Sequence, residues 1–141
     1  MRPHLLKFSG ICSYPGDVTI NFDNLNAKGL YLIVGDTGAG KTTILDAMTY
    51  ALYGEVAQER ENAIASTHPH SKPPVIEFEF SKGDLRYVVH REPAHQGKNQ
   101  LPSKQWIEVY NSEGIQIDKK TNARTVTDIC KEKVGLSGDE F

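Results

Sequence analysis

The feature that most constrains this chain is a glycine-rich octapeptide between an apolar run and a stretch with helical periodicity. It follows the pattern G-x-x-x-x-G-K-[ST], with Gly35, Gly40, Lys41 and Thr42 at the defined positions. In a chain of 141 residues a chance match has a probability of roughly one in a few hundred. Glycines let successive backbone N–H groups wrap around an anion at a helix N-terminus, so the octapeptide predicts a phosphate-binding loop.

The segments on either side of this loop predict a strand before it and a helix after it. Residues 30–34 are continuously apolar, as in a strand that is buried on both faces of a sheet. From Thr42 to Tyr53 the apolar residues recur at helical spacing, and Gly54 stands where a left-handed cap would end the helix. We therefore expect residues 30–34 to form the central strand of a mixed sheet.

The residues of the predicted loop have separate expected roles. The backbone N–H groups from Gly38 to Thr43 should point at the phosphates, with Thr43 as a donor to the α-phosphate. The Lys41 ammonium should lie between the β- and γ-phosphates as the catalytic group, and the Thr42 hydroxyl should ligate Mg²⁺. The complete expected nucleotide-binding set is Gly35, Asp36, Thr37, Gly38, Ala39, Gly40, Lys41, Thr42 and Thr43.

The remaining sequence predicts an antiparallel region and a second helix. Alternating apolar residues predict strands at 4–8 and 18–22, a hairpin at 76–80 and 85–89, and a second strand pair at 106–110 and 115–117. Residues 55–74 read as a surface loop, and 126–134 as a helix that ends at Gly135. The expected fold class is α/β, with the phosphate loop at 35–42 and a peripheral antiparallel β lobe over about 75–118.

Composition excludes several classes of protein. Charged residues make up 24% and hydrophobic residues 38% of the chain, which is typical of a globular protein, and no apolar run could span a bilayer. Cys12 and Cys130 lack metal-type spacing, so we interpret both as ordinary thiols. With no secretory signal at the N-terminus, a cytoplasmic location without membrane contact is expected. The net charge of −2 gives no general attraction to nucleic acid.

Two kinds of nucleotide-site motif are absent from the sequence. There is no N-K-x-D segment of the kind that reads guanine, and no apolar strand followed by Asp-Glu that would complete a Mg²⁺ site and supply a base for water. Residues 137–140 offer a capping box that would open another helix just before the chain stops at Phe141. We therefore expect a fragment that binds nucleotide and hydrolyses it negligibly by itself.

The segment from Gly35 to Gly54 resembles the start of the SbcC family, the SMC-type ATPases of bacterial DNA repair. The resemblance extends over nearly the whole chain, including the Ser13-bearing loop and the strand with Tyr87, Arg91 and Pro93. It implies the N-terminal half of an ABC-type ATPase head that binds ATP and Mg²⁺, whose C-terminal half follows a coiled coil. It also implies a second copy of the head, DNA and an SbcD-type nuclease as partners.

One residue departs from the family pattern, and two other functions stay open. Relatives often carry a basic or amide side chain just before the serine of the first loop, where this chain has Cys12, so a nucleotide contact from that position is in doubt. One alternative is another P-loop NTPase, either RecF-like or a nucleotide kinase. The other is a nucleotide-binding module without hydrolysis.

Three further features have a functional and a structural interpretation. His68 and His70 could bind a metal, but no further ligand has suitable spacing, so a solvated loop is favoured. The stretch from Lys82 to Lys104 holds five Lys/Arg and two Asp/Glu, which could contact DNA or protect hairpin edges from pairing. Trp106 could stack on a base, although its alternating strand favours a core or sheet-face role.

Overall fold

The described elements are two strands, a short and a long helix, six more strands and a final helix, in an order that the sequence largely predicts. The structure, a computed structural model, describes residues 1–25, 32–56, 64–66, 70–96 and 100–135. Its elements are β1 (Arg2–Ile11), β2 (Tyr14–Asn21), the 3-10 helix η1 (Phe22–Asn24), α1 (Lys41–Tyr53), β3 (Val75–Lys82), β4 (Leu85–Glu92), β5 (His95–Gln96), β6 (Gln100–Leu101), β7 (Lys104–Tyr110), β8 (Gln116–Lys120) and α2 (Ala123–Val134).

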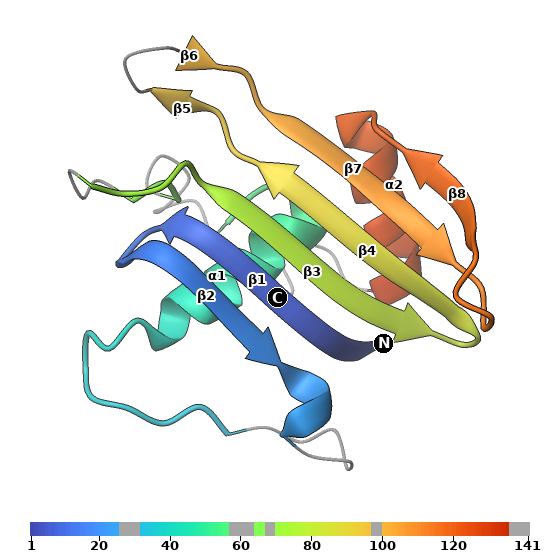
Figure 1. Cartoon of the computed structure of the whole chain (residues 1–141), viewed down its shortest axis with the longest axis horizontal. Helices are drawn as coiled ribbons and strands as arrows, with labels where there is room; N and C mark the ends of the chain where they lie inside the picture. Colours follow the sequence, from blue (N-terminus) through green and yellow to red (C-terminus); the bar gives the residue numbers. More distant parts are fainter. Residues whose placement is uncertain (26–31, 57–63, 67–69, 97–99, 136–141) are drawn as a thin grey trace.

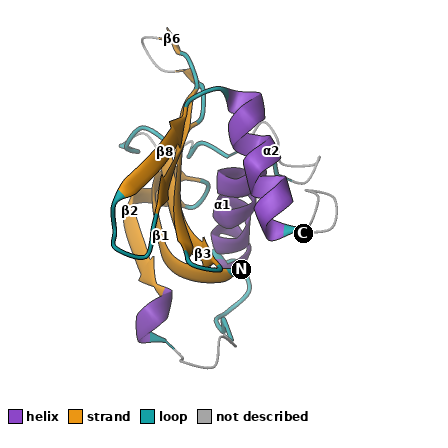
Figure 2. Ribbon diagram, turned by 90° about the vertical axis from the view of Figure 1, so that its right-hand side faces the viewer, coloured by secondary structure: helices purple, strands orange, loops and turns teal. Residues whose placement is uncertain are grey.

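The described part of the chain forms one main sheet with helices on a single face. The strand order is β2-β1-β3-β4-β7-β8, and each neighbouring pair is antiparallel. Figure 1 shows α1 and α2 behind the sheet, and the rotated view of Figure 2 shows the two layers edge-on. The predicted hairpins are confirmed. The expected lobe over 75–118 is not separate, because β3 pairs with β1 and so continues the N-terminal hairpin.

The core lies between the sheet and the two helices. Strand residues alternate between buried and partly exposed, as in β3, where Ile76, Phe78 and Phe80 are fully buried. They belong to the same buried cluster as Leu52 of α1, and Phe80 stacks on the cross-strand Tyr87 with ring centroids 5.1 Å apart. This period of two fixes which face of the sheet the helices cover.

The prediction of a central buried strand at 30–34 is wrong for the part that the structure describes. Residues 32–34 form no strand, and Leu32, Ile33 and Val34 are 86%, 42% and 77% exposed. In Figure 1 this segment runs outside the sheet toward the N-terminus of α1. A strand needs a neighbour for its N–H and C=O groups, and none of the described strands pairs with this segment.

The C-terminus of α1 is held by the sheet and by α2. The last four carbonyls of a helix have no partner within the helix. Here the oxygen of Tyr50 accepts from the N–H of Gly54 at 2.8 Å, as the sequence predicts for a left-handed cap. Arg91 of β4 donates to the oxygens of Ala51 and Leu52 at 2.7 and 3.2 Å. The position of α1 against the sheet is therefore fixed by polar contacts as well as by apolar packing.

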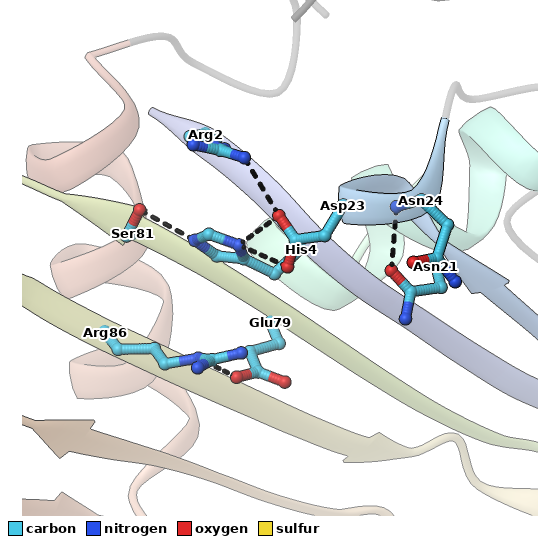
Figure 3. A network of polar contacts seen from close by, with 8 residues as sticks. All are labelled: Arg2, His4, Asn21, Asp23, Asn24, Glu79, Ser81 and Arg86. Carbon is cyan, nitrogen blue, oxygen red and sulfur yellow. Dashed lines mark hydrogen bonds and ion pairs between the residues drawn. The ribbon is translucent and has the colours of Figure 1, made fainter. Parts of the chain in front are cut away.

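A polar network joins β1, η1 and β3 on the other end of the sheet (Figure 3). The Nδ1 of His4 lies 2.9 Å from each carboxylate oxygen of Asp23, and its Nε2 lies 2.8 Å from the Ser81 hydroxyl. Arg2 also donates to Asp23 at 3.1 Å. Because η1, which contains Asp23, directly follows β2, these contacts fix the start of the segment that leads toward the glycine-rich loop.

Candidate nucleotide-binding site

The glycine-rich loop has the backbone conformation that an anion-binding loop requires. Gly38 and Gly40 both have left-handed φ angles, 84° and 83°, which only glycine adopts without strain. The loop closes through a hydrogen bond from the Ala39 N–H to the Asp36 oxygen at 3.1 Å. Gly40 is the N-cap of α1 and supplies no side-chain acceptor for the first N–H groups of the helix. The Thr43 N–H donates to the Gly40 oxygen at 3.1 Å, so the N–H groups of Lys41 and Thr42 are the helical donors left for an anion.

The Lys41 side chain folds back over the loop. Its Nζ donates to the main-chain oxygens of Gly35 and Asp36 at 2.5 and 2.6 Å. The ammonium is thus held at the first two residues of the loop. An arriving phosphate would exchange these carbonyl acceptors for charged oxygens, which are stronger hydrogen-bond acceptors for an ammonium.

The residues after Lys41 line a small cavity with the loop. The cavity has a volume of about 220 Å³ and is bounded by Gly38, Gly40, Lys41, Thr42, Thr43 and also Ser13. Thr42 is exposed while Thr43 is 7% exposed, so only Thr42 presents its hydroxyl freely to a ligand. Of the other expected residues, Gly35, Asp36, Thr37 and Ala39 all lie on the exposed part of the loop.

The loop is supported from the β1–β2 hairpin by Tyr14. Its hydroxyl donates to the Ala39 oxygen at 3.2 Å, and its ring packs edge-on against Phe8, with centroids 5.5 Å apart at 81°. A Cβ at position 40 would lie 2.7 Å from the Tyr14 ring. Neither Ser13 nor Tyr14 is in the predicted site set. The sequence signal that could have indicated them is the Ser-Tyr-Pro-Gly turn, because such a turn has to pack against another segment of the chain.

Cys12 contacts a different part of the chain. It has a positive φ of 44°, its N–H donates to the Ile64 oxygen at 2.9 Å, and its Sγ lies 3.7 Å from the same oxygen. The thiol therefore faces residue 64. Cys130 is fully buried, and burial raises the pKa of its thiol to about 12. Neither cysteine is part of a disulfide among the described residues.

The remaining candidates from the sequence are distributed over the surface. His70 is exposed, and within the described ranges no group of His, Cys, Asp or Glu could hold a metal ion. His68 and the capping box at 137–140 lie outside the described residues. Trp106 stacks on His90 with centroids 3.8 Å apart at 10°, which confirms its sheet-face role.

Neither interpretation of the charged stretch from Lys82 to Lys104, DNA contact or protection of hairpin edges, is tested by the structure. Three of the four cations described there, all except Lys82, already contact protein groups. Arg86 pairs with Glu79, Lys104 lies 3.8 Å from Glu92, and Arg91 is buried under α1.

A comparison with known families adds an independent observation to this geometry. A family model described as an AAA domain matches residues 5–137, nearly the whole chain. The chain belongs to the AAA domain family. The match spans both the glycine-rich loop and the antiparallel sheet, so in this family the two form one unit rather than a loop attached to an unrelated domain.

Comparison with individual proteins shows which AAA-domain proteins this chain resembles. The chain is 35% identical to the SbcC subunit of the nuclease SbcCD from Clostridium acetobutylicum, 31% identical to that from Bacillus subtilis and 32% identical to that from Staphylococcus aureus strain MRSA252. Each comparison covers 100% of this chain but only 12%, 13% and 14% of the relative. The resemblance to SbcC is thus confirmed, and this chain spans about an eighth of the length of these relatives.

A solved structure gives the same fold. It comes from work on the structural biochemistry of ATP-driven dimerization and DNA-stimulated activation of SMC ATPases, and it matches with a TM-score of 0.51 at 18% identity. The comparison covers 100% of this chain and 84% of that one. It supports the predicted fold class, an α/β P-loop head of SMC type. Among the described residues, no helix is long and apolar enough to cross a membrane.

Proposed function

We propose that this chain binds the triphosphate of ATP at residues 35–43, as the front part of an SbcC-type ATPase head. The observation that carries the proposal is the uncapped N-terminus of α1, directly below a loop with two left-handed glycines and the Lys41 ammonium. Backbone donors, a helix dipole and one cation then act on the same phosphates. The coarser property, nucleotide binding, is what the fold of the AAA and SMC relatives implies.

The residues present fit both ATP and Mg²⁺. The cavity of about 220 Å³ lies between the loop and Ser13, which leaves room for the β- and γ-phosphates. Mg²⁺ at such sites takes few protein ligands and several water and phosphate oxygens, so the exposed Thr42 hydroxyl is a suitable ligand without a carboxylate cluster. When bound, the metal would neutralise charge on the phosphates. Lys41 would orient the terminal phosphate for hydrolysis.

The wider role rests on the relatives. SbcC-like hydrolysis, an SbcD-type nuclease partner, DNA and a second copy of the head are part of the proposal, because the relatives are named as the SbcC component of the nuclease SbcCD. A cytoplasmic location belongs to the same proposal. The exposed apolar segment 32–34 supports a further partner, the C-terminal half of the head, whose strands would cover it.

The sharpest test of the phosphate site is Lys41→Ala. Removing the ammonium should weaken Mg²⁺-ATP binding by about ten- to more than a hundredfold, because a charge-assisted contact contributes roughly 1.5 to 3 kcal/mol. Isothermal titration measures this, with Lys82→Ala as the control, since Lys82 is an exposed lysine far from the loop in sequence. If Lys41→Ala binds ATP as tightly as the unchanged chain, the loop does not hold the phosphates.

The metal is tested separately with Thr42→Ala. This variant keeps the ammonium and the backbone donors but removes the expected Mg²⁺ ligand, so ATP binding should lose its dependence on Mg²⁺. Titrations of ATP with Mg²⁺ and with a chelator distinguish the two variants. An unchanged ratio of the two affinities in Thr42→Ala would reject the assigned metal ligand.

A nucleotide-binding module without hydrolysis is the second candidate for the chain by itself. The observation in its favour is that no apolar strand in the sequence is followed by Asp-Glu. We expect the chain alone to hydrolyse ATP far more slowly than a complete ATPase. A turnover on the order of 1 s⁻¹ or more from the purified chain would contradict this.

A further inference from the structure

A second polar cavity lies at the opposite end of α1 from the glycine-rich loop. Its volume is about 480 Å³, and it is bounded by the last turn of α1, the end of β4, the start of β7 and the outer surface of α2. Because α1 has 13 residues, the two ends are separated by about 20 Å. The cavity is therefore distinct from the proposed ATP site.

Arg91 brings a buried positive charge to this cavity. The residue is only 4% exposed, and its Nε and Nη2 donate to Ala51, Leu52 and Thr127. No acceptor among the described residues takes a hydrogen bond from Nη1, and no described carboxylate lies in ion-pair contact with the guanidinium. A buried guanidinium with unused N–H groups destabilises the fold unless an anion or a water molecule accepts hydrogen bonds from them.

The space beside Nη1 is kept open by a glycine. A Cβ built on Gly54 would lie 3.0 Å from Nη1, so any other residue there would crowd the unused end of the guanidinium. Gly54 also lines the cavity, and its φ of 77° already favours glycine as the cap of α1. The same residue thus ends the helix and leaves Nη1 accessible from the cavity.

The other charged groups make the cavity positive overall. Arg91, Lys104, Arg124 and Lys131 face Glu92 and Asp128, four cations against two carboxylates. The ion pairs between them are long, 3.8 Å for Lys104 with Glu92 and 3.9 Å for Arg124 with Asp128. Such loose and exposed pairs contribute little, so these cations can turn toward a ligand at small cost.

We propose that this cavity binds a phosphate monoester of metabolite size. Its phosphate would take the unused N–H groups of Arg91 together with Arg124 and Lys131, since guanidinium groups recognise phosphate oxygens in pairs. A volume of about 480 Å³ exceeds what a bare phosphate needs and lies in the range of small-ligand sites. Tyr50 and Tyr53 also line it and would contact the organic part of the ligand.

The proposal is tested by following backbone amide signals during titration without Mg²⁺. The probes are inorganic phosphate, glucose 6-phosphate and glucose, and the reporters are the amides of 123–128 on α2, with those of 38–43 recording any binding at the glycine-rich loop. We expect the phosphates to shift the α2 amides and glucose to leave them unchanged. The double variant Arg124→Ser with Lys131→Ser should weaken this binding at least tenfold.

The matched control is Lys82→Ser, which removes an exposed cation that does not line the cavity and should bind as the unchanged chain does. Tighter binding of glucose 6-phosphate than of inorganic phosphate supports the ester as ligand, and equal binding supports a free oxyanion at the same site. The proposal is overturned if neither phosphate shifts the α2 amides at tens of millimolar, or if the double variant binds as well as Lys82→Ser.

Discussion

The Nε of Arg91 donates to the main-chain oxygen of Ala51 over 2.7 Å, and this contact joins the central strand β4 to the last turn of α1. Because the glycine-rich loop precedes the same helix, Arg91 helps to set where the phosphate site lies relative to the sheet. Thr127 of α2 extends the arrangement, since its hydroxyl accepts from Arg91 and donates to the Tyr53 oxygen at 3.3 Å.

Replacing Arg91 by methionine should destabilise the fold by about 2 to 4 kcal/mol. The carbonyls of Ala51 and Leu52 would be left buried without donors, at roughly 1 to 3 kcal/mol each. Urea denaturation measures the loss. Arg86→Met is the control, because Arg86 is a half-exposed arginine on the same strand that pairs with Glu79, and its removal should cost less than about 1 kcal/mol. Equal losses in the two variants would contradict the capping role of Arg91.

A steric contact between Gly40 and Tyr14 predicts coupled mutational effects. Gly40→Ala would bring a Cβ to 2.7 Å from the Tyr14 ring. Gly38 has a similar left-handed φ, but a Cβ built there would have no other atom within 4 Å. Both should suffer backbone strain of roughly 1 to 2 kcal/mol, and Gly40→Ala should lose more. Adding Tyr14→Ala should rescue Gly40→Ala but not Gly38→Ala. If the losses of unfolding free energy in Gly40→Ala and Tyr14→Ala add in the double variant within about 0.5 kcal/mol, the Tyr14 ring does not hold the loop.

The polar face of the sheet predicts a dependence of stability on pH. Burial lowers the pKa of His90, but contacts to the carboxylates of Glu77 and Glu92 outweigh it and raise the pKa above its ordinary value of 6.5. Its contribution to stability is therefore complete below pH 6.5 and is lost as pH rises through the folded-state pKa. The pKa of Glu77 is lowered from 4.5, chiefly by His90, so its contribution is present above pH 4.5 and is lost on acidification.

The contribution of this pair should be largest between pH 4.5 and 6.5. In His90→Gln the unfolding free energy should fall relative to the unchanged chain in that window, by at most about 1 kcal/mol for these part-exposed groups, and the difference should shrink above it. Denaturation at a series of pH values checks this. His70→Gln, at an exposed position and in none of the contacts given for His90 and Glu77, is the control. A difference that grows on raising the pH through 7 would reverse the assigned sign.

The exposed segment 32–34 predicts self-association of the chain alone. Leu32 and Val34 are 86% and 77% exposed, and neighbouring exposed apolar side chains favour association with another copy. Sedimentation velocity should show concentration-dependent association that decreases in Leu32→Ser with Val34→Ser. The matched double variant Ile115→Ser with Ile117→Ser removes apolar groups that are 56% and 55% exposed near and on β8. A greater effect of that second variant would locate the association at the sheet edge instead.

Local sequence determined most of the secondary structure and the chemistry of the glycine-rich loop. The helix from Lys41 ends at Gly54 because a left-handed cap needs glycine, and the strands follow the alternation of apolar and polar side chains along the sequence. Gly38 and Gly40 adopt their positive φ angles for the same local reason. Such features depend on residues a few positions apart, which is why the sequence was sufficient to predict them.

Tertiary structure alone decided the features that depend on partners distant in the chain. Residues 32–34 carry the composition of a buried strand, yet a strand exists only where a neighbour takes its hydrogen bonds, and no described strand pairs with this segment. From the sequence, Arg91 is one surface cation in an alternating strand. In the fold, the side chain contacts the end of α1, forty residues earlier in the chain. Tyr14 reaches Ala39 in the same way. The sequence determines what each segment can do locally, and packing determines which groups meet.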